Sequence, residues 1–141
     1  MTLTYDNTNV FARILRNELP CEKVYEDEHA LAMMDIAPMS KGHVLVIPKQ
    51  ASRNLLDADP ASLASALAVA QKIAKAVMKA FQADGVRLAQ FNEAPAGQTV
   101  FHLHFHVIPC YEGVALRGHG GPMEEKAVLA AQAAAIRSAL G

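Results

Sequence analysis

The chain has 141 residues, of which 52% are apolar and 19% are charged, and its net charge is −1. This length suits one domain with a sizeable core, and the near-neutral charge gives no electrostatic reason to expect nucleic acid or an anionic membrane as a partner. The polar residues 1–9 contain no apolar signal segment, and Cys21 and Cys110 form no CxxC pair. We therefore expect a single domain over residues 1–141, cytoplasmic and with reduced thiols.

The first half of the chain alternates short elements. Residues 10–16 follow a polar cap and predict a short helix. Residues 24–25 and 30–34 predict two strands joined by an acidic turn, and residues 42–47 predict a strongly apolar strand that ends at Pro48.

A long helix follows, because Asp59 and Pro60 are a typical helix cap and first residue. Apolar residues then recur every three or four positions as far as Phe81, which predicts one buried stripe. Lysines at 72, 75 and 79 interrupt the alanine-rich stretch, so we expect no membrane span. Asp84 and Gly85 are predicted to end this helix.

Residues 86–91 and 100–108 predict two further strands, and residues 118–121 a flexible glycine-rich loop. Pro122 is predicted to open a last helix that runs to Leu140. Runs of strands separated by helices favour an α+β fold with an antiparallel sheet of about five strands, a long central helix, and short N-terminal and C-terminal helices.

Three histidines alternate with apolar residues within residues 101–108: His102, His104 and His106. On a strand they would share one face, while the residues between them would face the core. A single histidine would most simply be a core or edge residue, but three in register indicate a site. A metal site is the weaker alternative, because the outer pair would stand about 13 Å apart on a straight strand and no carboxylate or thiol lies within the row.

The loop at residues 92–99 leads directly into this row. Gly97 would let the backbone approach a ligand closely, and Gln98 and Thr99 offer donors that suit phosphate oxygens. Alone, such a loop is an ordinary hairpin connection. Its position beside the histidines favours a phosphate-binding loop.

The segment Gly-Gln-Thr-Val-Phe-His-Leu-His-Phe-His-Val-Ile at residues 97–108 resembles the signature of the histidine triad (HIT) superfamily. Residues 10–20 resemble the N-terminal helix and turn of that family, and residues 34–38 with 42–49 resemble its central hairpin. The resemblance implies a HIT-like fold, a nucleotide hydrolase and a homodimer built by pairing two sheets. It implies a purine nucleotide as substrate, no cofactor and no metal.

The resemblance also implies roles for single residues. His104 would be the nucleophile that attacks an α-phosphorus and forms a nucleotidyl-histidine intermediate, and it must be neutral to do so. His106 and His43 would contact the phosphate and handle protons, and His102 would support the row. The implied substrate-binding residues are Asp35 for the ribose hydroxyls, Asn92 beside the nucleophile, Gly97, Gln98 and Thr99 for the phosphates, and Phe11, Ile14, Met33, Ile36 and Leu45 for the base.

The leaving group is less defined, because the chain combines features of two branches. The Asp35 hairpin and Asn92 resemble the Hint branch of nucleoside phosphoramidases, whereas residues 96–100 and 42–46 resemble Fhit, a dinucleoside polyphosphate hydrolase. We expect release of a nucleoside monophosphate from a phosphoramidate or acyl-adenylate. Cleavage of dinucleoside polyphosphates is an alternative, as is a nucleotide-binding module with incidental turnover. His119 is interpreted as a solvated loop residue, with contact to the leaving group as the weaker alternative.

Overall fold

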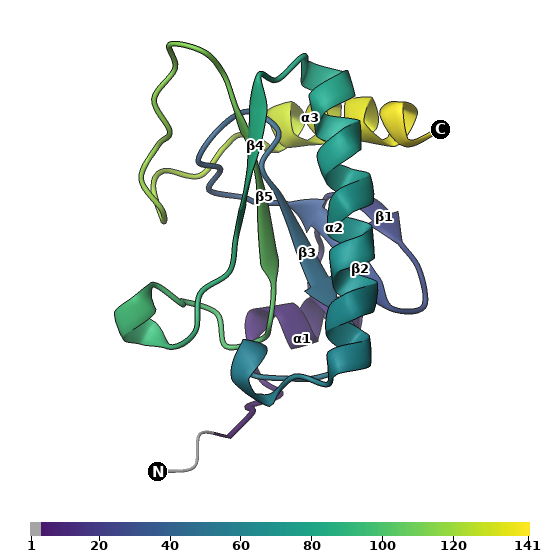
Figure 1. Cartoon of the computed structure of the whole chain (residues 1–141), viewed down its shortest axis with the longest axis vertical. Coiled ribbons are helices and arrows are strands. Elements are labelled where there is room, and N and C mark those ends of the chain that lie inside the picture. Colours follow the sequence, from purple (N-terminus) through teal and green to yellow (C-terminus); the bar gives the residue numbers. More distant parts are fainter. Residues whose placement is uncertain (1–3) are drawn as a thin grey trace.

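The computed structural model describes residues 4–141, so the first three residues of the polar N-terminus lie outside the described part of the chain. A five-stranded antiparallel sheet carries the predicted long helix on one face, which confirms the α+β fold (Figure 1). The elements are α1 (Val10–Leu15), β1 (Lys23–Glu26), β2 (Ala30–Met34), β3 (Val44–Pro48), η1 (Leu55–Asp57), α2 (Pro60–Phe81), β4 (Gly85–Ala89), η2 (Ala94–Ala96), β5 (Phe105–Cys110) and α3 (Lys126–Leu140).

The strand order is β1-β2-β3-β5-β4, and every neighbouring pair is antiparallel. Strands β2 and β3 are buried along their whole length, because both faces of the sheet are covered. One face packs against α2 and α3, and its core includes Leu103, Phe105 and Val107, as the alternation in the sequence predicted. The other face packs against α1 through Phe11.

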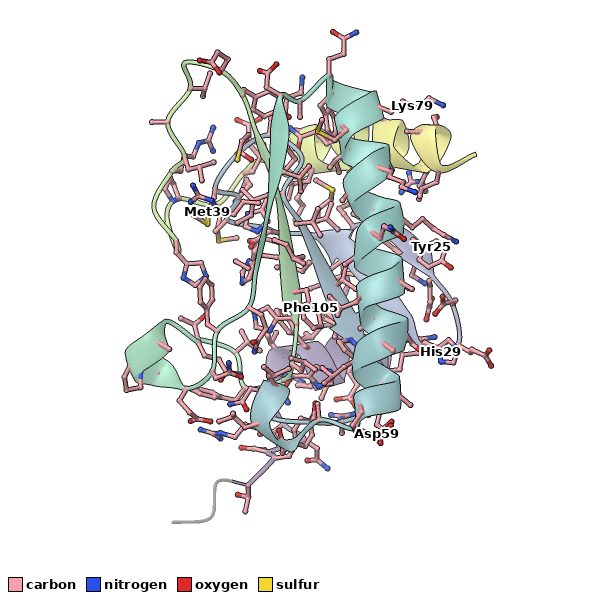
Figure 2. The ribbon with its side chains drawn as sticks, viewed as in Figure 1. Tyr25, His29, Met39, Asp59, Lys79 and Phe105 are labelled. Carbon is pink, nitrogen blue, oxygen red and sulfur yellow. The ribbon has the colours of Figure 1, made fainter. Side chains whose placement is uncertain are left out.

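Helix α2 begins as predicted, because the Asp59 side chain accepts a hydrogen bond from the Ser62 amide and Pro60 takes the first helical position. Figure 2 shows Asp59 and Lys79 near its two ends. The helix ends at Phe81, where Gln82 adopts a left-handed conformation (φ 52°). The predicted stop at Gly85 is therefore wrong, since Gly85 already pairs with Cys110 in the sheet.

By length and composition α2 could cross a membrane. Its inward side nevertheless forms the centre of the core, where Ile73 and Val77 are fully buried against the sheet. Both Lys72 and Lys75 on its other faces are exposed. This packing makes α2 the core helix of the domain.

Strand β5 starts later and ends later than predicted. Its pairing with β3 reaches only from Val107 to Phe105, and β3 ends at Pro48, which has no N–H to continue a ladder. Residues 100–104 are consequently irregular, and the Leu103 amide donates to the carbonyl of Ser52 instead. At the other end, beyond Val107, β5 pairs only with β4. Pro109 has no N–H to donate to a second neighbouring strand, but none is needed there, so the strand continues through it.

Three other boundaries also differ from the prediction. Strand β3 starts at Val44 because Gly42 turns the chain with φ 88°, and a Cβ there would lie 2.5 Å from the Phe81 ring. Strand β4 ends at Ala89 rather than at residue 91. Helix α3 starts at Lys126 rather than at Pro122, because the Glu124 amide is bonded to the carbonyl of Ile36 and Glu125 is extended.

Candidate active site

Strand register builds the floor of the site. Met33 lies opposite Leu45, and Leu45 lies opposite His106, so these three side chains share the face of the sheet away from α2. Helix α1 covers one side of this floor with Phe11. The resulting pocket has a volume of about 380 Å³, which is in the range of small-molecule sites.

His104 precedes β5 by one residue and lies at the edge of this floor. Its Nδ1 lies 2.7 Å from the carbonyl oxygen of His102, and its ring packs edge-to-face on Phe11 at 4.9 Å. A carbonyl can only accept, so Nδ1 carries the proton and donates it. The opposite nitrogen, Nε2, is therefore the one with a free lone pair, as a nucleophile requires.

His43 and His106 form a directed chain of hydrogen bonds. The Met39 amide donates to His43 Nδ1 at 3.0 Å, so neutral His43 carries its proton on Nε2. That nitrogen lies 3.0 Å from His106 Nδ1, which places the proton of His106 on its own Nε2. His106 Nε2 is buried and has no hydrogen-bond partner among residues 4–141, so a donor is available at the floor of the pocket.

Burial keeps this histidine cluster neutral. It lowers the pKa of His43 to about 4 and that of His106 to about 3, with Asp35 opposing the shift at His43. For His106 the positive charges that His104, His43 and His119 would carry act in the same direction as burial. The pKa of His104 is also lowered by burial, against the effect of its bond to the His102 carbonyl. At neutral pH His104 is therefore unprotonated.

His102 does not share the pocket with the other two histidines of the triad. Its Nε2–H donates to the Pro48 carbonyl at 2.7 Å, and its Nδ1 accepts from the Tyr5 hydroxyl at 2.6 Å. Both ring nitrogens are thus used inside the protein, and the role of the residue is to fix the carbonyl that orients His104. The sequence predicted that all three histidines share one face of a strand. This is wrong for His102, because it precedes β5 in an irregular segment and its ring binds Pro48 and Tyr5.

A polar network holds the loop before the triad. Arg53 makes a bidentate bond to Glu93, with both distances 2.8 Å, and its guanidinium stacks on Phe101 at 4.3 Å. Gln98 accepts from Asn54 and from the Glu93 amide, and it donates to the carbonyls of Arg53 and Val100. Glu93 itself adopts φ 73°, a conformation that such a network is needed to hold.

The structure contradicts three of the predicted substrate-binding roles, those of Gln98, Asn92 and Gly97. The side chain of Gln98 is saturated by protein partners, so it holds the loop and does not offer the free phosphate donor that was predicted. Asn92 accepts from the Leu55 amide and from the side chain of Gln90, and it lies outside the pocket lining. Gly97 also lies outside the lining, and its φ of 105° serves the turn after η2.

Most of the remaining candidates do line the pocket. They are Phe11, Ile14, Met33, Asp35, Ile36, Leu45, Thr99, His104 and His106. His119 and Gly120 also line the pocket, although the sequence analysis placed neither among the site residues and gave His119 a pocket role only as the weaker alternative. His119 was interpreted as a solvated loop residue; it is exposed, but its ring lies 5.5 Å from that of His106. The sequence feature that could have pointed to this residue is a histidine flanked by glycines in the 118–121 segment.

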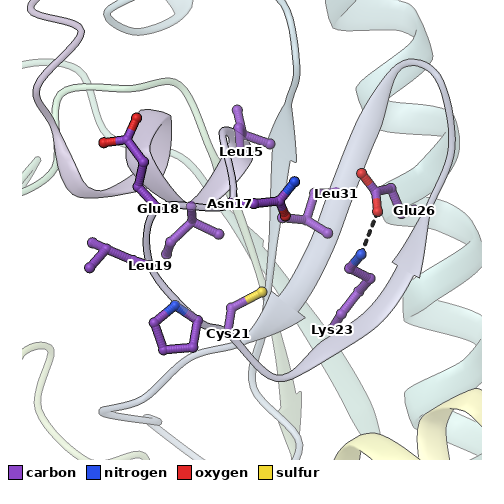
Figure 3. Close-up of a pocket in the computed structure, with 10 residues that line it drawn as sticks. Leu15, Asn17, Glu18, Leu19, Cys21, Lys23, Glu26 and Leu31 are labelled. Carbon is purple, nitrogen blue, oxygen red and sulfur yellow. Dashed lines mark hydrogen bonds and ion pairs between the residues drawn. The ribbon is translucent and has the colours of Figure 1, made fainter.

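A second hollow of about 420 Å³ adjoins the pocket beneath α1 (Figure 3). Cys21 contributes to the lining of both hollows, and the Lys23–Glu26 ion pair closes the far side of the second one. No histidine lines this second hollow within the described residues. The chemistry therefore belongs to the first pocket.

One group of residues could hold a metal ion. Ligand atoms of Asp35, His43 and His106 all lie within 4.8 Å of one another. The three triad histidines do not converge in the same way, because His102 and His104 bind backbone carbonyls. A metal at the first group would have to replace the His43–His106 hydrogen bond.

Comparison with known proteins places the chain in a family. The HIT domain model matches residues 16–113. Adenylylsulfatase HINT3 of Arabidopsis thaliana is 37% identical to this chain. The aligned part covers 88% of this chain and 66% of that protein.

Solved structures are similar as well. A HIT-like protein from Bartonella henselae, described as involved in cell-cycle regulation and bound to an unknown ligand, has 53% identity and a TM-score of 0.91, over 96% of this chain and 99% of that one. A zinc-bound histidine triad family protein from Mycobacterium smegmatis has 36% identity and a TM-score of 0.80, over 93% and 91% of the two chains. The family match over residues 16–113 and these relatives show that the chain belongs to the HIT domain family.

Proposed function

We propose that this protein is a nucleotide hydrolase that releases a nucleoside monophosphate from a substituent on its α-phosphate, through a nucleotidyl intermediate on His104. The observation that carries the proposal is the fixed tautomer of His104, with Nδ1–H bound to a carbonyl and Nε2 free. Relatives named adenylylsulfatase and HIT family hydrolase support hydrolysis at such a bond.

The pocket has the parts that a nucleoside monophosphate requires. Phe11, Met33 and Leu45 supply apolar surface for a base, and Asp35 supplies carboxylate oxygens for the ribose hydroxyls. The Asp35 carboxylate already accepts from the Ala37 amide at 2.8 Å, so its orientation is fixed. The buried Nε2–H of His106 would donate to a phosphate oxygen as negative charge builds up there.

Two steps complete the reaction. In the first, His104 Nε2 forms a bond to the α-phosphorus, and the bond to the substituent breaks with its electron pair on the leaving atom. A sulfate, carboxylate or phosphate leaves as the anion, whereas an amine takes up a proton from solvent as its bond breaks. In the second, water attacks the phosphorus, the N–P bond breaks with its pair returning to Nε2, and one proton is released. Imidazole N–H groups and Thr99, the loop residue that lines the pocket, supply the charge stabilisation in both steps.

Trapping of the intermediate tests this proposal. Wild-type protein is mixed with an adenosine 5′-phosphoramidate labelled at phosphorus, quenched in alkaline denaturant to preserve the P–N bond, and assayed for protein-bound label. His104→Ala should lose the label and lower kcat by at least about 10³-fold while still binding AMP. His29→Ala, which changes an exposed histidine outside the pocket, is the matched control. Turnover by His104→Ala close to wild type would refute the mechanism.

A panel of substrates separates the alternatives. Adenosine phosphoramidates, acyl-adenylates, adenosine 5′-phosphosulfate and diadenosine polyphosphates share the adenosine α-phosphate and differ only in what leaves. A clear preference for diadenosine polyphosphates would favour the Fhit-like alternative. Binding of all of them without trapping or turnover would favour a nucleotide-binding module.

We also propose that the protein is a cytoplasmic homodimer. Strand β4 forms one edge of the sheet, and Leu88 on it is 51% exposed. An uncovered edge strand with an exposed apolar side chain is suited to pair with a second copy about a two-fold axis. The two free thiols, Cys21 and Cys110, fit a reducing compartment.

A further inference from the structure

The segment between β5 and α3 returns across the mouth of the pocket. The Arg117 amide donates to the Met39 carbonyl at 2.7 Å, and the Glu124 amide donates to the Ile36 carbonyl at 2.9 Å. Figure 2 marks Met39 on the side of the molecule where this strap, residues 117–124, runs. Both anchors lie in the loop that follows Asp35, so the strap is fixed relative to the site.

The tip of the strap is a tight turn. Arg117 and Glu124 form an ion pair of 3.8 Å across its base, and the Gly121 amide donates to the Gly118 carbonyl. Gly120 has φ 76°, which side chains rarely adopt, and a Cβ on Gly121 would lie 3.2 Å from the Gly118 carbonyl oxygen. These contacts define the backbone turn that carries His119.

The aromatic contacts place His119 on a particular side of the reacting group. Phe11 packs on His104 at 4.9 Å, His104 on His106 at 5.0 Å, and His106 on His119 at 5.5 Å. His119 is thus the last member of a series of ring contacts that begins at Phe11, the residue that the proposed function assigns to the base. Phe91 supports this arrangement, because its ring contacts both His106 and His119. A leaving group attached to the α-phosphate would lie next to His119.

We infer that His119 binds the leaving group and selects nucleotides whose leaving group is an oxyanion, namely a sulfate, carboxylate or phosphate. The inference rests on the function proposed above and names the substrate class of the same site. When the bond between phosphorus and the bridging oxygen breaks, its electron pair stays on that oxygen. An imidazole N–H of His119 donates to it and stabilises the negative charge, and no proton has to be transferred to an anion of this kind.

His119 is suited to this task by its exposure. The other pocket histidines are buried, which disfavours a positive charge on them. His119 is exposed and lines the same pocket, so its ring can reach a substituent that projects out of the pocket. The buried residues would then hold the nucleotide part, and the exposed histidine would meet the leaving group.

Two substrates with the same AMP part test the inference. The kcat/KM values for adenosine 5′-phosphosulfate and adenosine 5′-phosphoramidate are measured for wild type, His119→Ala, His119→Gln and the control His29→Ala. We expect His119→Ala to lower kcat/KM for the phosphosulfate by about tenfold to hundredfold and to lower the phosphosulfate/phosphoramidate ratio at least fivefold. His119→Gln, which keeps an N–H donor, should restore part of the ratio, and His29→Ala should match wild type.

The outcomes distinguish the two proposals. Wild-type protein that turns over neither substrate would refute the proposed function. Wild-type turnover with an unchanged ratio in His119→Ala would overturn the inference alone. A ratio that rises in His119→Ala would also overturn it, because His119 would then serve the amine leaving group as an acid.

Discussion

Lowering the pH from 7.5 to 5.0 should destabilise the folded protein by at least about 4 kcal/mol, because His43 and His106 stay neutral inside it. Burial lowers their pKa values to about 4 and about 3. In the unfolded chain each has the ordinary value near 6.5 and takes up a proton as the pH falls. The unfolded state therefore binds more protons, and the free energy of unfolding must fall with pH.

The size of the loss in the free energy of unfolding follows from the difference between the unfolded pKa and the solution pH. At pH 5 the unfolded pKa lies about 1.5 units above the solution pH, and each unit is worth about 1.4 kcal/mol, so each histidine contributes about 2 kcal/mol. Carboxylates with lowered pKa values, such as those of Glu18, Glu26 and Glu93, act mainly below their ordinary value of 4.5. The contribution of these two histidines to the free energy of unfolding is complete above their unfolded pKa of about 6.5. It is lost as the pH falls toward 4 for His43 and toward 3 for His106.

Urea unfolding at pH 7.5 and 5.0, at one fixed protein concentration, measures the difference. His43→Gln removes one titrating group and should reduce the pH dependence by about 2 kcal/mol, whatever its effect on stability at pH 7.5. This is less than half of the total loss, because burial also lowers the pKa values of His102 and His104. His29→Gln alters an exposed histidine and should leave the dependence as in wild type. A wild-type loss below about 1 kcal/mol would show that the pair is not held neutral.

Asp35→Ala should bring kcat/KM for ribonucleotide and 2′-deoxyribonucleotide substrates at least about fivefold closer together, since the lost bonds are to ribose hydroxyls; an unchanged ratio would remove Asp35 from the ribose site. Activity should survive exhaustive chelation, and loss on EDTA treatment with recovery on adding zinc would instead support a metal at Asp35, His43 and His106. Light scattering should give about twice the single-chain mass of 15.1 kDa, and Leu88→Glu should lower that mass by placing a charge at the paired edge. A fully active wild-type protein of single-chain mass would contradict the dimer.

The sequence predicted those parts of the fold that local patterns decide. The Asp59 cap with Pro60 marked the start of α2, and the apolar run before Pro48 marked β3. The start of β5 depended on where its neighbour ends, and residues 100–104 carry no local sign of this. An alternating pattern therefore extended the predicted strand too far.

The candidate site shows the same difference between residues identified from a sequence pattern and residues whose role depends on distant segments of the chain. His104, His106, Asp35 and Phe11 were identified from a family signature, and the structure places all four around one pocket. Gln98 was misassigned because its partners Arg53 and Asn54 are more than forty residues away in the chain. No residue near Gln98 shows that its amide is already saturated.

The position of the leaving-group side was also beyond local patterns. His119 reaches the pocket only because the amides at 117 and 124 bind carbonyls of the loop after Asp35. Those bonds depend on backbone geometry rather than on side-chain type. The glycine-rich segment therefore predicted a turn, but local patterns favoured a solvated His119 over one that reaches the pocket.

The histidines of the site are held in two different ways, by the buried sheet and by an exposed turn, and this difference bears on substrate choice. His104 and His106 belong to the buried sheet, and the backbone groups of His102 and Met39 set their tautomers. In the proposed mechanism, changes there would alter attack on any substrate, because every α-phosphate would meet His104. His119 instead sits on an exposed turn that makes no ladder contact with the sheet in the described residues. We therefore expect substitutions in the strap to change which leaving group is accepted while the attack at phosphorus is retained, so that substrate preference depends on the strap more than on the triad.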